Sequence, residues 1–200
     1  MTDSPKVDLR VPELRVGTSR VLSDGHSVLR STVFDIRRRD GTWQTLNRET
    51  YDRGNGAVIL PYDRSRRTVL LVRQFRYPAY VNGHQAPLIE AIAGLLEGQD
   101  PLTVACKEAE EEAGVKVRNP RCVFTTFTSP GAVTETLACF IAEYGAADRI
   151  GAGGGLRQEG EDIEVLEPDF DDALAMIADG QIVDAKTIML LQHLRLAGLL

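Results

Sequence analysis

Three glutamates in one short segment are the residues of this chain with the clearest capacity for chemistry. Glu108, Glu111 and Glu112 occupy positions i, i+3 and i+4 of the stretch from Lys107 to Gly114. In a helix, this spacing places the three carboxylates on one side within a single turn. Like charges at such short range repel each other, and a hard divalent cation turns that repulsion into binding. The pattern predicts a magnesium site and a metal-dependent reaction on phosphate.

Length, composition and charge limit the kind of protein that carries this segment. The 200 residues suit one globular domain, or one domain with an added N-terminal piece, and a hydrophobic fraction of 43% is enough for a core. The net charge of −6 argues against a general nucleic-acid binder.

The cysteines and the apolar runs indicate a cytoplasmic chain. Cys106, Cys122 and Cys139 are odd in number and lack the paired spacing of a disulfide framework or a zinc site. Residues 1–15 are polar, and no apolar run approaches the length of a membrane span. We therefore expect a soluble cytoplasmic protein that does not contact membranes.

The hydrophobic pattern predicts strands with helices between them. Asp100 and Pro101 are a good N-cap and first residue for the acidic helix, which Gly114 should end. Two further helices are predicted over 169–178 and 184–196, the last ending in an apolar run that should be buried. The result is an α/β fold, an α/β/α sandwich around a mixed sheet. The predicted strands are 27–36, 43–46, 57–62, 68–75, 87–92, 115–117, 122–127, 136–144 and 163–166.

The N-terminal quarter has a different character. Residues 1–50 predict an antiparallel β extension with a hairpin turn at 39–42, and residues 51–200 carry the main domain. A hairpin of this size is too small to be stable alone, and its strand edges need covering. We therefore expect the extension to form a homodimer.

The segment from Gly94 to Val115 resembles the Nudix box of the Nudix hydrolases. That pattern is Gly, five residues, Glu, seven residues, Arg-Glu, an apolar residue, any residue, Glu-Glu, any residue, Gly and an apolar residue. This chain has Asp100 for the first glutamate, Lys107 for the arginine, and a middle spacer of six residues. The three metal-facing glutamates and both glycines are present.

Flanking stretches extend the resemblance over residues 22–194, toward the Nudix subgroup that cleaves GDP-mannose. They include 51–56, 72–76, 80–83, 129–131, 152–155, 161–165 and 186–187. The resemblance implies Mg²⁺-dependent hydrolysis of a nucleoside diphosphate sugar, foremost GDP-mannose to GMP and mannose 1-phosphate, with Mn²⁺ as a substitute. Two alternatives stay open: an ADP-ribose or ADP-sugar pyrophosphatase, and a Nudix-fold nucleotide-binding module without turnover.

The resemblance also implies roles for individual residues. Glu111 would support the metal site directly or through water, and Lys107 would orient a box glutamate. Because we expect Glu112 to face solvent, Glu112→Gln should abolish turnover with little effect on the fold. The implied metal ligands are Glu108, Glu112, Glu161 and the carbonyl of Ala93.

A second carboxylate cluster follows the glycine-rich loop 151–155, which we expect to be a mobile lid. By resemblance, Glu159 is the leading general base, with Glu161 as the other candidate. Arg76 is the best phosphate-binding candidate, Arg48 would reach a partner subunit's site, and His26 stands where the subgroup has a base-stacking aromatic. The implied substrate contacts are His26, Arg48, Glu49, Arg76, Gly94, Leu95, Glu135 and Lys186.

Overall fold

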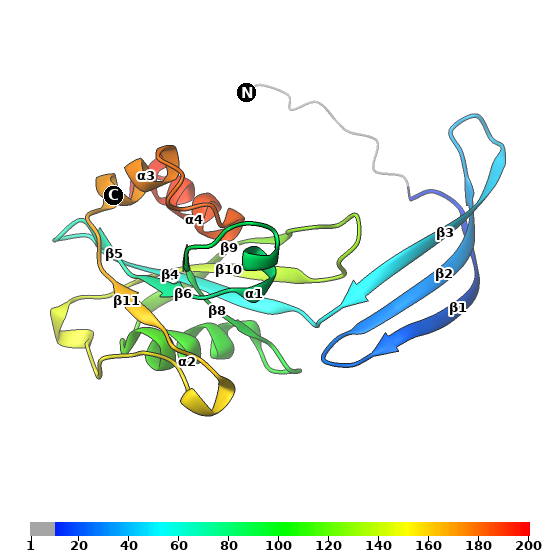
Figure 1. Cartoon of the computed structure of the whole chain (residues 1–200). Coiled ribbons are helices and arrows are strands. Elements are labelled where there is room, and N and C mark those ends of the chain that lie inside the picture. The colour runs from blue at the N-terminus through cyan, green and yellow to red at the C-terminus, as the bar shows by residue number, and fades with distance from the viewer. Residues whose placement is uncertain (1–10) are drawn as a thin grey trace, which may run out of the picture. The chain divides into compact units, whose positions relative to one another are not determined.

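The computed structural model describes residues 11–200, which divide into two compact units (Figure 1). The described part of the first unit is 11–53 with 131–134, and the second unit is 54–130 with 135–200. The first ten residues of the predicted extension lie outside the described residues. No helix within residues 11–200 has the length and apolar character needed to cross a membrane.

The first unit contains an antiparallel sheet of three strands, in the order β1-β2-β3. These are β1 (Leu14–Asp24), β2 (Val28–Arg37) and β3 (Trp43–Asp52). The predicted hairpin turn between β2 and β3 is confirmed, with Gly41 at a φ of 85°. β1 has no counterpart among the predicted strands, and β3 is longer than predicted.

One face of this sheet carries a row of apolar side chains. Val16 pairs with Phe34 and Phe34 pairs with Leu46, so the three share a face. Arg48 lies two residues beyond Leu46 and is on the same face, whereas Glu49 is on the opposite one. The side chains of β1 are exposed along its whole length.

The second unit is built on a mixed sheet of order β5-β4-β10-β9, with β8 paired to β4. β4 and β10 are parallel, and the other pairs are antiparallel. The strands are β4 (Gly56–Asp63), β5 (Thr68–Val69), β8 (Ile92–Leu95), β9 (Arg118–Phe127) and β10 (Thr136–Glu143). A smaller antiparallel sheet joins β11 (Glu164–Leu166), β6 (Leu71–Gln74) and β7 (Leu88–Glu90).

Helices cover both faces of the mixed sheet (Figure 1). α2 (Pro101–Ala113) packs on β4 and β8, while α4 (Ala185–Leu196) packs on β4 and β10 beside α3 (Phe170–Ala178). Side chains alternate along β4, so that Ile59 packs toward α2 and Leu60 toward α4. Fully burying such a side chain contributes roughly 1.5–3 kcal/mol. The predicted α/β/α sandwich is confirmed, with a short α1 (Tyr77–Val81) in addition.

The helix ends follow the sequence signals. The Asp100 side chain accepts a hydrogen bond from the Thr103 N–H, and Gly114 takes the left-handed conformation that ends α2. The predicted strand 115–117 is wrong, because only Val115 forms a bridge there. The apolar end of α4 is only partly buried: Leu194 is inaccessible, but Leu196 is 88% exposed.

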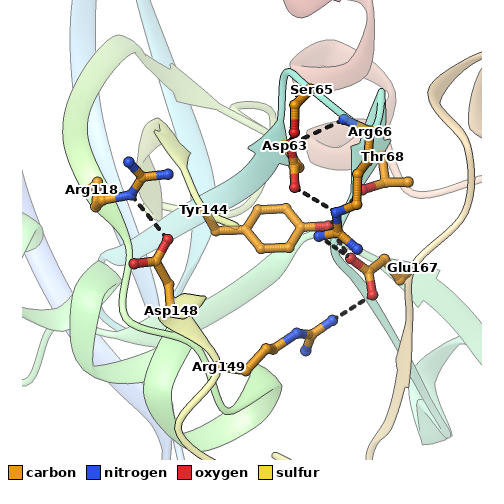
Figure 2. Close-up of polar contacts among 9 residues, drawn as sticks. All are labelled: Asp63, Ser65, Arg66, Thr68, Arg118, Tyr144, Asp148, Arg149 and Glu167. Atoms are coloured by element: carbon orange, nitrogen blue, oxygen red, sulfur yellow. Dashed lines mark hydrogen bonds and ion pairs between the residues drawn. The ribbon is translucent and has the colours of Figure 1, made fainter. Parts of the chain in front are cut away.

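A polar network ties the β4–β5 turn to the end of β10 (Figure 2). Buried Tyr144 donates a hydrogen bond of 2.6 Å to Glu167, which also pairs with Arg66 and Arg149 at 2.7 and 2.8 Å. Arg66 in turn donates to the buried carboxylate of Asp63 at 2.6 Å. The network links the β4–β5 turn and the end of β10 to Glu167, which follows β11.

The ionised Asp63 should contribute stability that acid removes. Burial raises the pKa of Asp63, but hydrogen bonds from Ser65 and Arg66 outweigh it and hold the pKa below the ordinary 3.8. A lowered carboxyl pKa gives stability that is present above the unfolded value and is lost as pH falls. We expect Asp63→Asn to cost about 2 kcal/mol at pH 7 and progressively less as the pH falls below 3.8, measured by urea unfolding. A difference independent of pH would contradict this.

Candidate functional site

The three glutamates lie on one helix as predicted, but Glu112 is placed differently from the prediction. Glu112 lies on the same side of α2 as Ala105 and Ala109, which pack on the sheet, and is only 2% exposed. The expectation that Glu112 faces solvent is therefore wrong. Glu111 is more exposed and pairs with Lys107 at 3.0 Å, so the lysine does orient a box glutamate.

Close contact between β8 and α2 explains the glycine at position 94. A Cβ atom on Gly94 would lie 2.3 Å from Oε1 of Glu108, too close for any side chain. Glu108 therefore lies directly on the backbone of β8. The neighbouring Ala93 and Leu95, both half-buried, belong to the same strand.

The carboxylate of Glu112 is surrounded by negative charge. Burial, and then the charges of Glu108 and Glu161, raise the pKa of Glu112 to about 8, although Arg76 and a hydrogen bond with the Ala93 backbone act in the opposite direction. Within residues 11–200, Oε2 of Glu112 is buried and finds no hydrogen-bond partner. Only in its ionised form would this group be stabilised by a further positive charge close to it.

The glycine-rich loop, which was expected to be a mobile lid, is hydrogen-bonded to the end of α2 in this structure. The N–H groups of Ile150 and Gly151 donate to the carbonyl of Gly114, at 2.8 and 3.2 Å. Those of Gly154 and Gly155 donate to the carbonyls of Glu112 and Glu111, at 2.9 and 3.1 Å. A Cβ atom on Gly153 or Gly155 would clash with its neighbours, so these two glycines allow the close approach.

This fastening brings the second carboxylate cluster to the first. Oε2 of Glu161 accepts a hydrogen bond of 2.8 Å from the Leu156 N–H, and a Cβ on Gly155 would lie 2.4 Å from the same oxygen. Glu159 ends the short helix η2 (Arg157–Glu159), and its side chain lies outside the described part of the structure.

Arg76 and Lys186 meet through a residue that sequence reasoning did not select. Nε of Arg76 donates to Oε2 of Glu90 at 2.7 Å, and Nζ of Lys186 donates to Oε1 at 2.6 Å. Lys186 also pairs with Asp184, and its side chain is 12% exposed. One sequence signal could have revealed Glu90: a charged residue inside the apolar strand 87–92 must find a partner when buried.

The remaining predicted contacts are distributed over both units. Glu135 is half-buried and immediately precedes β10. His26, Arg48 and Glu49 belong to the first unit and are exposed, His26 in the β1–β2 turn and the other two on β3. The structure therefore brings together Glu108, Glu112, Glu161, Arg76, Ala93 and Gly94.

These residues fit a divalent cation. Among the side chains described, no group of three or more already has the arrangement of a formed metal site. The chemistry of the donors is nevertheless suitable, because a buried oxygen of Glu112 has no partner in the described part of the chain and is close enough to feel the charges of two further carboxylates. Oxygen-rich, negatively charged sites of this kind suit Mg²⁺.

The fold and the acidic site define a class of phosphate-cleaving enzymes, and the comparisons with known proteins agree. Residues 52–189 match the NUDIX domain, and residues 13–51 match the N-terminal domain of the GDP-mannose pyrophosphatase NudK. The chain belongs to the Nudix family and is a Nudix hydrolase.

Individual relatives cover nearly the whole chain. A GDP-mannose pyrophosphatase of Cronobacter sakazakii is 48% identical over 182 residues, 90% of this chain and 94% of the relative. One of Pectobacterium atrosepticum is 49% identical over 180 residues, 90% and 92% of the two chains. The crystal structure of an ADP compounds hydrolase has the same fold, with a TM-score of 0.70, 15% identity, and coverage of 98% and 100%.

Glu112→Gln should remove two effects of the buried carboxyl group: the loss of folding stability at high pH and the stabilisation by Mg²⁺. Because the folded carboxyl has its pKa raised from 4.5 to about 8, folding stability without divalent cations falls as pH rises between these values. At pH 8 we expect the variant to melt several degrees above the wild type, and Mg²⁺ to raise the melting temperature of the wild type alone. If Mg²⁺ raised the melting temperature of both proteins equally, the assignment of Glu112 as a metal ligand would be wrong.

The loop contact predicts a sharp difference between two glycines. Gly153 has a φ of 70°, and its Cβ would lie 2.3 Å from the carbonyl oxygen of Glu112, whereas Gly160 has a φ of 78° and open space around it. We expect Gly153→Ala to cost about 3 kcal/mol and Gly160→Ala about 1 kcal/mol in urea unfolding. Equal costs would show that the loop is not packed on α2.

Proposed function

We propose that this chain hydrolyses the pyrophosphate bond of a nucleoside diphosphate sugar, with GDP-mannose as preferred substrate and GMP and mannose 1-phosphate as products. The observation that carries the proposal is the buried carboxylate oxygen of Glu112, which has no hydrogen-bond partner among the described residues and lies near Glu108 and Glu161. The choice of GDP-mannose is supported by relatives named GDP-mannose pyrophosphatase, which are 47–49% identical to this chain over nearly its whole length.

The carboxylates would hold Mg²⁺ as the cofactor. Its ligands would be Glu108, Glu112, Glu161 and the Ala93 carbonyl, with Glu111 in support. When bound, the ion neutralises phosphate charge and lowers the pKa of the attacking water.

The other residues of the site bind the substrate and move the proton. Nε of Arg76 is engaged by Glu90, so the two terminal NH₂ groups of its guanidinium are the donors left for the diphosphate. Water adds across the P–O–P bridge, and its proton passes to Glu159 or Glu161 as general base. The remaining substrate contacts in the second unit would come from the backbone of Gly94 and Leu95 and from the side chains of Glu135 and Lys186.

A panel of sugar nucleotides tests the substrate. With Mg²⁺ present, we expect GDP-mannose to have a kcat/KM at least about tenfold above ADP-ribose and ADP-glucose, with GMP and mannose 1-phosphate identified as products. A tenfold preference for ADP-ribose would overturn the GDP-mannose assignment. Absence of turnover on every member of the panel would instead support a binding module without catalysis.

We further propose that residues 1–50 form the dimer contact of a homodimer and that residues 51–200 are the catalytic domain. The apolar row of Val16, Phe34 and Leu46 lies on one face of a single-layer sheet, and Val16 is 73% exposed. A second copy of the chain would cover this face. Arg48, on the same face, would then reach the partner's site, and His26 and Glu49 would contribute from the same unit.

Light scattering tests the dimer. We expect the wild type to have twice the mass of one chain, and Val16→Asp to have the mass of one chain because a carboxylate cannot be buried there unpaired. Val33→Asp, on the opposite face and 40% exposed, is the matched control and should remain dimeric. A monomeric wild type would refute the proposal.

A further inference from the structure

Glu90 is a buried acid at the end of β7 with no role in the chemistry proposed above. Its side chain is only 5% exposed, and each carboxylate oxygen accepts a hydrogen bond from a different cation, Arg76 at 2.7 Å and Lys186 at 2.6 Å. Burial raises the pKa of Glu90, but Lys186 and then Arg76 outweigh it and hold the pKa below its ordinary value. Glu90 is therefore an ionised bridge between two cations.

The far side of this bridge is anchored at the start of α4. Lys186 donates to Oδ1 of Asp184 at 2.8 Å, and Oδ2 of Asp184 caps the helix by accepting from the N–H and hydroxyl of Thr187 at 3.0 and 2.5 Å. The Thr187 hydroxyl oxygen also accepts a hydrogen bond of 2.6 Å from the N–H of Ala91, the residue after Glu90. The contacts form a closed ring that fixes the Glu90 carboxylate.

Arg76 stands on the near side of the bridge. It follows β6 as the N-cap residue of α1, and its side chain is 40% exposed. Its charge acts on Glu112 of the acidic cluster. Since Glu90 engages Nε, the guanidinium plane is held at one edge, while its terminal NH₂ groups donate no hydrogen bond to the residues that the structure describes.

We propose that Glu90 is a positioning residue, which holds the Arg76 guanidinium in the orientation that binds the diphosphate of the substrate. The inference rests on the proposed function, because it takes Arg76 to bind a diphosphate. A salt bridge of purely structural value would affect the free energy of unfolding but would not be coupled to ligand binding through Arg76. Coupling is therefore the quantity to measure.

A double-mutant cycle on ligand binding measures this coupling. The probe is methylenebisphosphonate with Mg²⁺, titrated calorimetrically, which resists hydrolysis and so reports binding without turnover. We expect Glu90→Gln to weaken binding about tenfold in the wild-type background and less than about twofold in the Arg76→Ala background. Equal weakening in both backgrounds, no weakening in either, or a wild type that does not bind the probe would overturn the inference.

Two controls keep the experiment decisive. Glu164→Gln removes a glutamate that also pairs with an arginine, Arg73, but is 53% exposed, and it should leave binding unchanged. If Glu90→Gln does not fold, Glu90→Asp in the same cycle retains the buried negative charge and shortens the side chain, which lengthens its contact with Arg76. Failure of the proposed function appears separately, as wild-type protein that binds the probe but cleaves no sugar nucleotide.

Discussion

The site depends on one electrostatic constraint, the burial of the Glu112 carboxylate among other negative charges. An unpaired buried charge costs several kcal/mol, and here Glu108 and Glu161 add repulsion. A divalent cation bound by these oxygens would offset that cost and would at the same time attract a diphosphate. The instability of the carboxylate cluster by itself and the action on pyrophosphate that we propose for it would thus have the same physical origin.

Close backbone contacts keep the carboxylates of the cluster near one another. Gly94 lets β8 approach the Glu108 side chain, and Gly153 lets the loop after β10 lie against the carbonyl of Glu112. Hydrogen bonds from that loop to the last turn of α2 then keep Glu161 beside the helix. On the other side of the sheet, the buried Glu90 connects the site to the N-terminus of α4. The strand β8, the loop after β10 and Glu90 thus all fix the positions of the charged side chains of the site.

Local signals were sufficient to predict some of this structure. Asp100, Pro101 and Gly114 mark both ends of α2 because caps depend on neighbouring residues, and the glutamate spacing follows from helix geometry. The burial of Glu112 was not predicted, because it depends on how α2 packs on the sheet. The pairing of Glu90 with Lys186 joins positions 96 apart in sequence, which no local pattern can show. The packing of Gly153 on α2 was not predicted either, because flexibility and close approach favour the same residue type.

Binding of Mn²⁺, followed by electron paramagnetic resonance as the loss of signal from the free ion, tests the central claim most directly. The account predicts that the wild type binds Mn²⁺ and that Glu112→Gln weakens binding at least about tenfold, since one charged ligand is lost. Glu110→Gln is the matched control, because this neighbouring glutamate is exposed on α2 and should leave the affinity unchanged. Equal affinity in the wild type and Glu112→Gln would contradict the account.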